Sequence, residues 1–177
     1  MLKKKSQQHK AKYTAYVACS IDGRISLSSN TLPTFTSKED WEFFQNALSK
    51  ADAVISGHNT YKVAKERLDK RNTFVLTSKV KTIIEKGNVK FINPKYVDLK
   101  KLFSEYKSVA IVGGAHVYQS MLSLGLIDEI YVTIEPVILG RGKEMFIDGK
   151  KNTNLKLIST KKLNKKGTML LRYKVSK

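Results

Sequence analysis

Apolar residues gather in short runs separated by polar stretches along the whole chain, and this pattern predicts alternating strands and helices. Runs rich in β-branched or aromatic residues and bounded by turn-forming residues are typical of buried strands. The last two such runs are expected to form a hairpin around the sequence NKKG. The predicted strands occupy 13–19, 52–57, 72–78, 89–92, 108–112, 127–139, 155–163 and 168–175.

Four other segments have apolar residues at helical spacing. The clearest begins at Ser37 with Asp40 three residues further on, a pattern typical of a helix N-terminus. Trp41, Phe44 and Leu48 follow at spacings of three and four residues, so we expect them to face the core. Further helices are predicted at 58–68, 96–106 and 115–125.

Strands that alternate with helices, followed by a strand-rich C-terminal end, predict an α/β fold with three layers, α/β/α. Its mixed sheet should be mostly parallel, with antiparallel strands contributed by the C-terminal segment. A length of 177 residues suits one domain with a substantial core, and no internal repeat or interdomain linker is visible. We therefore expect a single domain over 13–177, preceded by a basic tail over 1–12.

The net charge of +18 is concentrated at the two ends of the chain. Residues 1–12 carry five lysines and no acid, and residues 149–177 carry ten Lys or Arg and no acid. Such an excess fits either a solubilising role or attraction of anionic ligands, from phosphorylated small molecules to nucleic acid. No motif that reads nucleic acid is present and the aromatic residues fall at core spacing, so nucleic acid is not favoured as the main partner.

The single cysteine and the hydropathy pattern exclude several classes of protein. Cys19 has no partner in the chain, which excludes a disulfide framework and a cysteine zinc site and points to the reducing cytoplasm. The longest stretch without Asp, Glu, Lys or Arg, 108–127, contains His116 and three glycines, so it does not resemble a membrane span. No secretory signal follows the basic start. No histidines lie at metal-ligand spacing, so we predict no metal site.

Three predicted strands end in turns of small or hydroxyl-bearing residues. Gly57 and His58 form one turn, Thr77 begins the second, and Gly113 and Gly114 form the third. In parallel α/β sheets, ligands bind outside the carboxyl ends of the strands, and free N–H groups at helix N-termini favour phosphate. A helix cap explains each turn alone, whereas the three together favour a phosphate-bearing ligand.

Two of these turns leave alternatives open. The pair Gly113–Gly114 is either a tight turn or a place where a ligand approaches the backbone closely, because glycine has no Cβ. It belongs to neither a GxGxxG fingerprint nor a P-loop. Thr77, Ser78 and Lys79 offer two hydroxyls and a cation, which suit either a surface turn or an extra phosphate such as the 2′-phosphate of NADPH.

Asp40 has two interpretations. In the first turn of a helix, its carboxylate can simply interact with the helix dipole. It also neighbours Trp41, Phe43 and Phe44, so it can be a carboxylate in an apolar cleft that gives a proton to a substrate nitrogen. The residues alone leave both interpretations open.

The stretches SIDGRIS, ADAVISGHNTY and AIVGGAHVYQSMLSLGLIDEIYVTIEPVILGRGKEMF, in this order, resemble the dihydrofolate-reductase-like superfamily over roughly residues 13–175. The likeness is greatest to the reductase domain of the bifunctional riboflavin-biosynthesis deaminase-reductase. It implies a reductase that transfers hydride from NADPH to a ribosylamino-pyrimidine phosphate, and it implies a homodimer. The deaminase half needs zinc-binding cysteines, so a chain with one cysteine is expected to be a stand-alone reductase.

The resemblance also implies roles for single residues. In relatives the glycine pair is joined by a strained peptide and lies against the cofactor, and in the dihydrofolate branch a carboxylate at Asp40, backed by Thr133, faces the pteridine. Arg71 stands where that branch holds the glutamate tail of its substrate; in pyrimidine reductases its partner would be a phosphate. The implied cofactor-binding residues are Ala18, Gly57, His58, Thr60, Thr77, Ser78, Lys79, Val112, Gly113, Gly114, Ala115, His116 and Val117. The implied substrate-binding residues are Ile21, Asp22, Asp40, Phe44 and Arg71, and the implied catalytic residues are Asp40 and Thr133.

Two substrates therefore remain open. The chain lacks the Asp-Pro-rich segment that the riboflavin pattern has between Thr60 and Arg71. In a ribosylamino-pyrimidine the hydride acceptor would be the sugar C1′, whereas in dihydrofolate it would be a C=N bond whose nitrogen needs a proton, which Asp40 could supply. A basic nucleic-acid-binding protein is the remote alternative.

Overall fold

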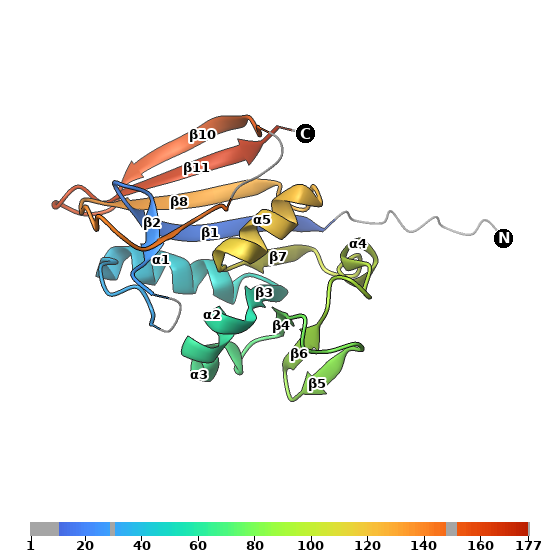
Figure 1. Cartoon of the computed structure of the whole chain (residues 1–177). Helices are drawn as coiled ribbons and strands as arrows, with labels where there is room; N and C mark the ends of the chain where they lie inside the picture. The colour runs from blue at the N-terminus through green and yellow to red at the C-terminus, as the bar shows by residue number, and fades with distance from the viewer. Residues whose placement is uncertain (1–10, 29–30, 148–151, 177) are drawn as a thin grey trace.

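A nine-stranded sheet forms the centre of the molecule, in the order β10-β11-β8-β1-β7-β3-β4-β6-β5. The computed structural model describes residues 11–28, 31–147 and 152–176. Figure 1 shows β10 and β11 at one end of the sheet and β5 and β6 at the other. The strands are β1 (Lys12–Ser20), β3 (Ala53–Gly57), β4 (Thr73–Leu76), β5 (Ile84–Lys86), β6 (Val89–Ile92), β7 (Ser108–Ile111), β8 (Glu129–Glu135), β10 (Leu155–Lys162) and β11 (Met169–Val175).

The pairing of these strands confirms the predicted mixed sheet. The central strands β8, β1, β7, β3, β4 and β6 pair in parallel. The C-terminal hairpin β10–β11 joins antiparallel through β11 to β8. The sequence did not reveal β5, which pairs antiparallel with β6 at the opposite edge.

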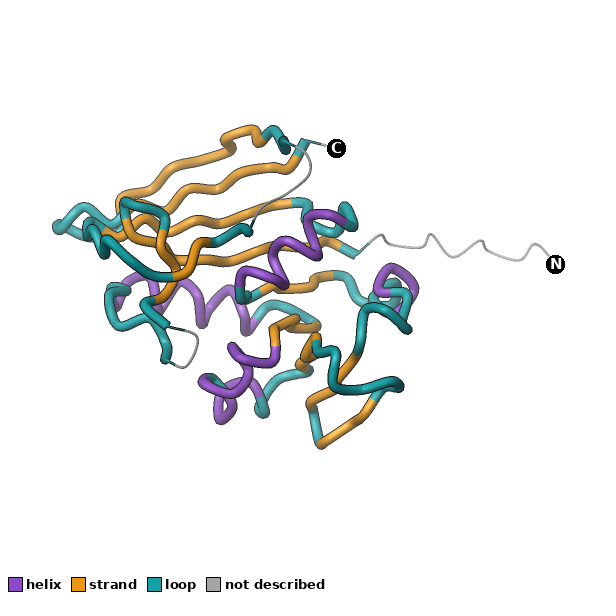
Figure 2. The backbone as a smooth tube through the Cα atoms, in the orientation of Figure 1, coloured by secondary structure: helices purple, strands orange, loops and turns teal. Residues whose placement is uncertain are grey.

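Helices cover both faces of the sheet, as the three-layer prediction requires (Figure 2). Alternate residues of each central strand point to opposite faces, so Ile55 and Phe74 join one apolar cluster while Val54 and Val75 join the other. The first cluster also contains residues of α4 and α5, and the second contains residues of α1, α2 and α3. The helices are α1 (Lys38–Ser49), α2 (His58–Val63), α3 (Lys65–Leu68), α4 (Leu99–Leu102) and α5 (Ala115–Ser123).

Several of the predicted helices and strands are longer than those in the structure. The helix expected over 58–68 is divided at Ala64, whose backbone leaves the helical region. The helix expected over 96–106 is reduced to the four residues of α4. The strand expected over 127–139 ends before Pro136, which has no N–H for a ladder hydrogen bond.

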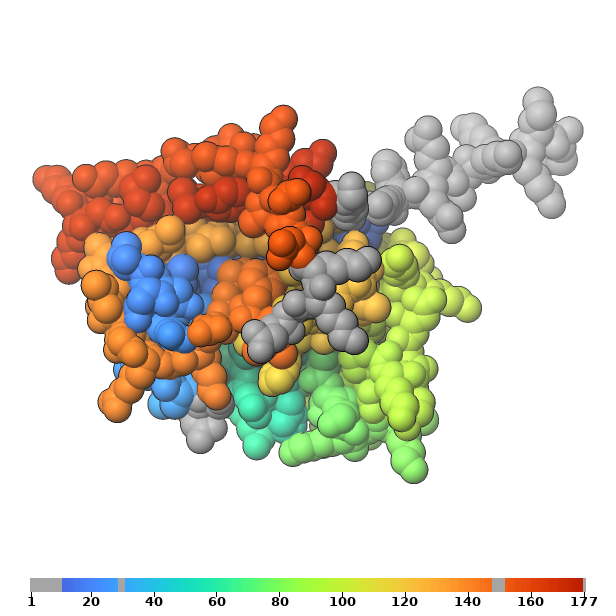
Figure 3. Space-filling model, turned by 45° about the horizontal axis from the view of Figure 1, so that its top comes forward, coloured from blue at the N-terminus to red at the C-terminus, as the bar shows by residue number. Residues whose placement is uncertain are grey.

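The polar segment after β1 contains an unpredicted strand. β2 (Arg24–Ser26) pairs with β9 (Lys143–Glu144) in a separate two-stranded sheet. Figure 3 shows the surface of this segment, in blue, beside the orange surface that leads into β9. The two segments are far apart in sequence, and their pairing covers one side of the cavity described next.

Candidate active site

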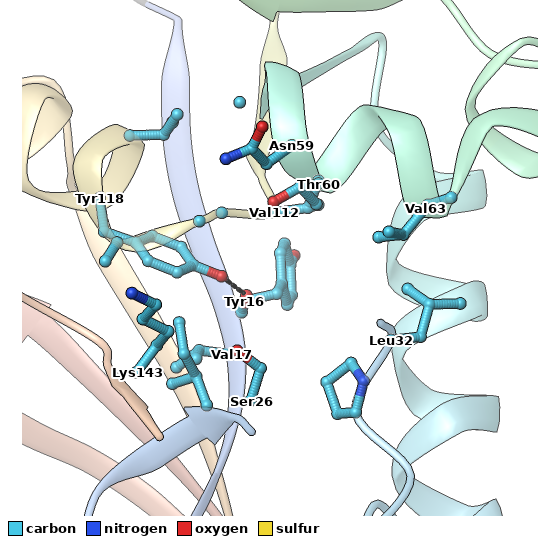
Figure 4. Close-up of a pocket in the computed structure, with 18 of the residues that line it drawn as sticks. Tyr16, Val17, Ser26, Leu32, Asn59, Thr60, Val63, Val112, Tyr118 and Lys143 are labelled. Carbon is cyan, nitrogen blue, oxygen red and sulfur yellow. Dashed lines mark hydrogen bonds between the residues drawn. The ribbon is translucent and has the colours of Figure 1, made fainter. Parts of the chain in front are cut away.

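A cavity of about 1010 Å³ opens at the carboxyl ends of β3, β4 and β7. Helices α1, α2 and α5 and the sheet strands β1 and β8 contribute to its wall. Figure 4 shows Asn59, Thr60 and Val63 on one side of this space and Tyr118 and Lys143 on the other. Segments that lie far apart in the sequence therefore converge on one hollow of a size that suits small-molecule ligands.

The cavity brings together most of the residues named from the sequence. All those implied for the cofactor line it: Ala18, Gly57, His58, Thr60, Thr77, Ser78, Lys79, Val112, Gly113, Gly114, Ala115, His116 and Val117. Asp40, Phe44, Arg71 and Thr133 line it as well.

Ile21 and Asp22, which the resemblance implies as substrate-binding residues, are not among the residues that line this cavity. The side chain of Ile21 is 62% exposed. The carboxylate of Asp22 accepts hydrogen bonds from the Ser20 hydroxyl at 2.6 Å and from the backbone N–H groups of Leu139 and Gly140 at 3.0 and 2.8 Å. Asp22 thus fastens the turn after β1 to the loop after β8, and these hydrogen bonds lower its pKa to about 2.

The glycines of two turns meet at the rim of the cavity. The N–H of Gly57 donates to the carbonyl of Gly113 at 2.7 Å, and the Gly113–Gly114 peptide bond is cis. Gly113 has φ +99°, and a Cβ at this position would lie 3.1 Å from the ring of Tyr118. A Cβ at Gly57 would lie 3.0 Å from Val117. The backbone of Gly113 therefore favours glycine through its positive φ, and at Gly57 a side chain would force Val117 to shift.

The turns lead into helices that begin without a side-chain cap. Gly57 precedes α2 and Gly114 precedes α5, and no side-chain hydrogen bond caps either helix. The first N–H groups of a helix lack partners within the helix and attract anions. Two such helix starts on one cavity are a suitable environment for phosphate groups.

His58 adds a neutral imidazole to this side of the cavity. Its Nδ1 is buried and has no hydrogen-bond partner among the described residues. Burial, with smaller contributions from Lys79 and Lys62, lowers the pKa of His58, so the ring is uncharged at neutral pH. An uncharged imidazole with a free buried nitrogen can hydrogen bond a polar group of a ligand.

The opposite corner of the cavity contains Asp40. Its side chain is only 8% exposed, and burial raises its pKa above the usual value. A hydrogen bond with Thr133, which is 1% exposed, acts in the other direction, while the charge of Glu135 raises the pKa further. The carboxyl group of Asp40 therefore holds its proton more tightly than an exposed aspartate does.

The predicted start of α1 is confirmed, and it shows that Asp40 is not the residue that caps the helix. Ser37 is the N-cap, and its Oγ accepts a hydrogen bond from the backbone N–H of Asp40 at 3.3 Å. The side chain of Asp40 instead faces β8. Of the three apolar residues expected in the core, Leu48 is buried and Phe44 is partly buried, but Trp41 is 37% exposed and lines the cavity.

Aromatic residues form another part of the wall, and two of them, Tyr16 and Tyr131, were not indicated by the sequence patterns. The rings of Tyr16 and Tyr131 stack at 5.3 Å with an interplanar angle of 9°, and Phe43 lies 5.4 Å from Tyr131. The guanidinium of Arg67 lies 4.5 Å from the ring centre of Trp41. Pairing of residues 16 and 131 on adjacent strands could have indicated the stack, but only once the strand register was known.

Tyr118 connects the two sides of the site. Its hydroxyl donates a hydrogen bond of 2.5 Å to the carbonyl of Tyr16, shown as the dashed line in Figure 4. Complete burial raises the pKa of Tyr118, so the hydroxyl remains a donor at physiological pH. Its ring packs beside Gly113, and the contact fixes α5 against β1 beneath the rim.

The described residues offer no metal centre. Over 11–28, 31–147 and 152–176, no group of three or more His, Cys, Asp or Glu side chains could hold an ion. In the same part of the chain, no helix is long and apolar enough to cross a membrane. Cys19 lies outside the cavity, and burial raises the pKa of its thiol, which disfavours the reactive thiolate.

Solved structures with the same fold include enzymes of two kinds. The riboflavin biosynthesis reductase Rib7 of Saccharomyces cerevisiae superposes with a TM-score of 0.74 at 19% identity, covering 97% of this chain and 92% of Rib7. The dihydrofolate reductase of Enterococcus faecalis, in complex with NADP(H), superposes with a TM-score of 0.71 at 19% identity and covers 95% and 98% of the two chains. At this identity the likeness establishes a dihydrofolate-reductase-like fold.

Two proteins of Bacillus subtilis are similar in sequence. YwjB is 27% identical over 160 residues, which is 85% of this chain and 91% of YwjB. YyaP is 44% identical over 55 residues, and this segment spans 31% of the chain and only 29% of YyaP.

The family model of the RibD C-terminal domain matches residues 66–169. The matched segment runs from α3 to the start of β11 and includes the glycine pair, α5 and β8. It spans more than half of the chain. The chain belongs to the RibD C-terminal domain family, a family of reductases with a dihydrofolate-reductase-like fold.

Proposed function

We propose that this protein is an NADPH-dependent reductase of the riboflavin-pathway pyrimidine reductase type. The observation that carries the proposal is that one cavity contains both the glycine-lined turns and a buried carboxyl group. The turns supply backbone donors for phosphates, and the carboxyl group faces the space where a flat substrate would lie. Membership of a reductase family supports this interpretation.

The cofactor side of the cavity fits a dinucleotide in three respects. The N-termini of α2 and α5 leave N–H groups for the pyrophosphate, and Thr77, Ser78 and Lys79 suit the 2′-phosphate. A Cβ at Gly57 would reach Val117, so only glycine keeps this wall open. When bound, NADPH would supply the hydride; the protein orients the two reactants and excludes water.

Arginines near α1 and α3 are suited to the substrate phosphate. Arg71 lines the cavity, and its guanidinium donates to Gln45 Oε1 at 3.2 Å. Arg67, in α3, also lines the cavity, with its guanidinium over the ring of Trp41. A phosphate or carboxylate placed between the two guanidiniums would be held by charge-assisted hydrogen bonds.

The pair Asp40–Thr133 favours a second candidate, the reduction of dihydrofolate. Reduction of its C=N bond requires a proton on nitrogen, and burial keeps a proton on Asp40 more tightly than in water. Thr133 hydrogen bonds the carboxyl group and holds its orientation. Phe44 lines the same part of the cavity and would contact the flat ring system.

The test offers the two substrates in parallel to the purified full-length chain while NADPH absorbance is followed. We expect saturable, substrate-dependent oxidation of NADPH with one of them, and tighter binding of NADPH than of NADH by intrinsic fluorescence quenching. Oxidation with 5-amino-6-(5-phosphoribosylamino)uracil supports the first candidate, and oxidation with dihydrofolate supports the second. No binding of NADPH at all would refute both.

A further inference from the structure

A second buried carboxylate lies beside the site and has no part in the function proposed so far. Glu135 is the last residue of β8, and its side chain is only 3% exposed. It follows Thr133 by two residues, so both side chains point to the same face of the sheet, the face that carries α1. Glu135 itself does not line the cavity.

Both side-chain oxygens of Glu135 accept hydrogen bonds. Its Oε1 accepts from the Ser37 backbone N–H at 2.7 Å and from the Ser37 hydroxyl at 2.8 Å. Its Oε2 accepts from the Thr168 hydroxyl at 2.7 Å. Thr168 Oγ1 already accepts from the side-chain amide of Asn164, so its own hydrogen is directed to Glu135. Both oxygens of Glu135 therefore act as hydrogen-bond acceptors, an arrangement well suited to a carboxylate.

This carboxylate is linked to Asp40 through the N-cap of α1. The Ser37 hydroxyl donates to Glu135 and accepts from the backbone N–H of Asp40. A negative charge at this place also interacts favourably with the N-terminus of α1. Glu135 thus fixes the helix turn that carries Asp40, and its charge disfavours a second charge on Asp40.

We propose that Glu135 is a positioning residue whose fixed negative charge keeps a proton on Asp40 and whose hydrogen bonds hold Asp40 toward the substrate. The inference rests on the second candidate of the proposed function, the reduction of dihydrofolate, in which Asp40 faces the substrate and gives it a proton. The glycine-lined turns take no part in this arrangement. Asp40 is the group that would touch substrate, and Glu135 acts only through it.

Other charged groups near the start of α1 act on the pKa of Glu39. The hydrogen bond that the side-chain amide of Asn164 donates to Glu39 at 3.1 Å lowers the pKa of Glu39, and Lys38 and Lys166 act in the same direction. Among the described residues, Glu135 is the charged group that acts on the pKa of Asp40. Neutralising Glu135 should therefore lower the pH at which Asp40 titrates, and no other charged group among these should offset the change.

The test measures the titration of Asp40 directly, by NMR of the ¹³C-labelled carboxyl groups of the full chain, with Asp40→Asn used to assign the signal. In Glu135→Gln we expect the midpoint of the Asp40 titration to move to lower pH. The Gln side chain can still accept from Ser37, so the helix start is retained. Glu135→Asp, which keeps the charge, should remain closer to wild type than Glu135→Gln.

A matched control is Glu129→Gln, because Glu129 is on the same strand and its carboxylate is bound by Arg172. It lies about 20 Å from Glu135 along the strand. This variant should leave the Asp40 titration unchanged. If Glu135→Gln does not fold, the wild-type protein still provides the test. Two carboxyl groups that interact each show the titration step of the other, so the Asp40 signal of the wild type should titrate in two steps.

Activity adds an independent readout. Turnover that needs a proton on Asp40 falls as pH rises, and in Glu135→Gln this fall should begin at lower pH. Activity at alkaline pH should drop about tenfold for each pH unit by which the Asp40 midpoint moves. An unmoved Asp40 midpoint in folded Glu135→Gln, or a single-step wild-type titration where that variant is unfolded, would overturn the inference. A lowered midpoint in a protein that oxidises no NADPH would instead leave the inference standing and refute the proposed function.

Discussion

The two sides of the cavity are built by different means. The side proposed for the cofactor, here called the cofactor side, relies mainly on backbone, where glycine turns approach one another and two helices begin without side-chain caps; the side chains of His58, Thr77 and Lys79 add to it. The substrate corner consists of side chains, with Asp40, Thr133 and Glu135 held by hydrogen bonds between α1 and β8. Backbone N–H groups can bind any phosphate, whereas a set of buried carboxyl groups is suited to the transfer of one proton to a particular substrate atom.

We therefore expect one side to determine the affinity for the cofactor and the other to determine the rate of the chemical step. A backbone-lined pocket tolerates changes in most side chains but not in the glycines that keep it open. The carboxylate corner is sensitive to single atoms, because each buried oxygen has a defined partner. Substitutions on the two sides should therefore affect different quantities, and the following predictions use that separation.

The largest effect is expected from Asp40→Asn. It removes the proton but keeps the shape and a hydrogen-bond acceptor for Thr133. If the substrate is dihydrofolate, we expect turnover to fall about 10²–10⁴-fold, the usual contribution of a general acid. Loss on a ribosylamino-pyrimidine should be far smaller. Steady-state kinetics on both substrates measure this, and equal minor losses would contradict a proton role for Asp40.

The control for this variant is cofactor binding. Asp40 lies on the substrate corner, so the affinity for NADPH should be unchanged within about twofold. A matching loss of affinity in Asp40→Asn would mean that the two sides are not separable.

Gly113→Ala should show the opposite pattern. At φ +99° alanine is strained, and its Cβ would lie 3.1 Å from the ring of Tyr118. We expect a destabilisation of about 1–3 kcal/mol and a weakening of NADPH binding of about tenfold. Denaturant unfolding and a fluorescence titration measure the two effects. Gly125→Ala, with φ +66° and nothing within 4 Å of the new Cβ, is the matched control, because it is strained but lies away from the cavity.

A smaller effect is expected from Lys79→Ala. If Lys79 contacts the 2′-phosphate, the variant should bind NADPH about tenfold more weakly, a typical cost of losing a charged hydrogen bond, while NADH binding stays the same. Lys81→Ala, on the same exposed loop but outside the cavity, should change neither. An equal loss for both cofactors would place Lys79 elsewhere on the dinucleotide.

Much of the cofactor side could be predicted from the sequence. Gly57, Gly113 and Gly114 follow apolar strand patterns directly, and parallel strands bring their carboxyl ends to one edge, so local signals were enough. The three-layer fold followed from the same alternation of elements. The strands β2 and β9 escaped notice because each has no more than three residues and no apolar periodicity.

The substrate corner could be predicted only in part. Asp40 was a candidate from its apolar neighbours in the sequence, and Thr133 from the family resemblance. Glu135 and Thr168 depend on the register of β8 and β11 and on where α1 begins. The hydrogen bonds of Asp22 could not be predicted for the same reason, because its partners Leu139 and Gly140 lie more than a hundred residues away. The hydrogen bond from Tyr118 to the carbonyl of Tyr16 in β1 likewise becomes visible only in the structure.

The smallest effect concerns stability, and it should again single out the carboxylate corner. Burial raises the folded-state pKa of Asp40 above 3.8, so the folded protein binds the proton more tightly than the unfolded chain. Stability should therefore fall as pH rises from about 4 through the folded-state pKa, and the cost is complete above it. Asp40→Asn removes that cost, so it should raise Tm at pH 7 by a few degrees, equivalent to about 1 kcal/mol. The gain in Tm of Asp40→Asn over the wild type should be smaller at pH 4. Thermal unfolding of both proteins at the two pH values measures the difference, and a variant equally stabilised at both would show that the gain has a cause other than the proton.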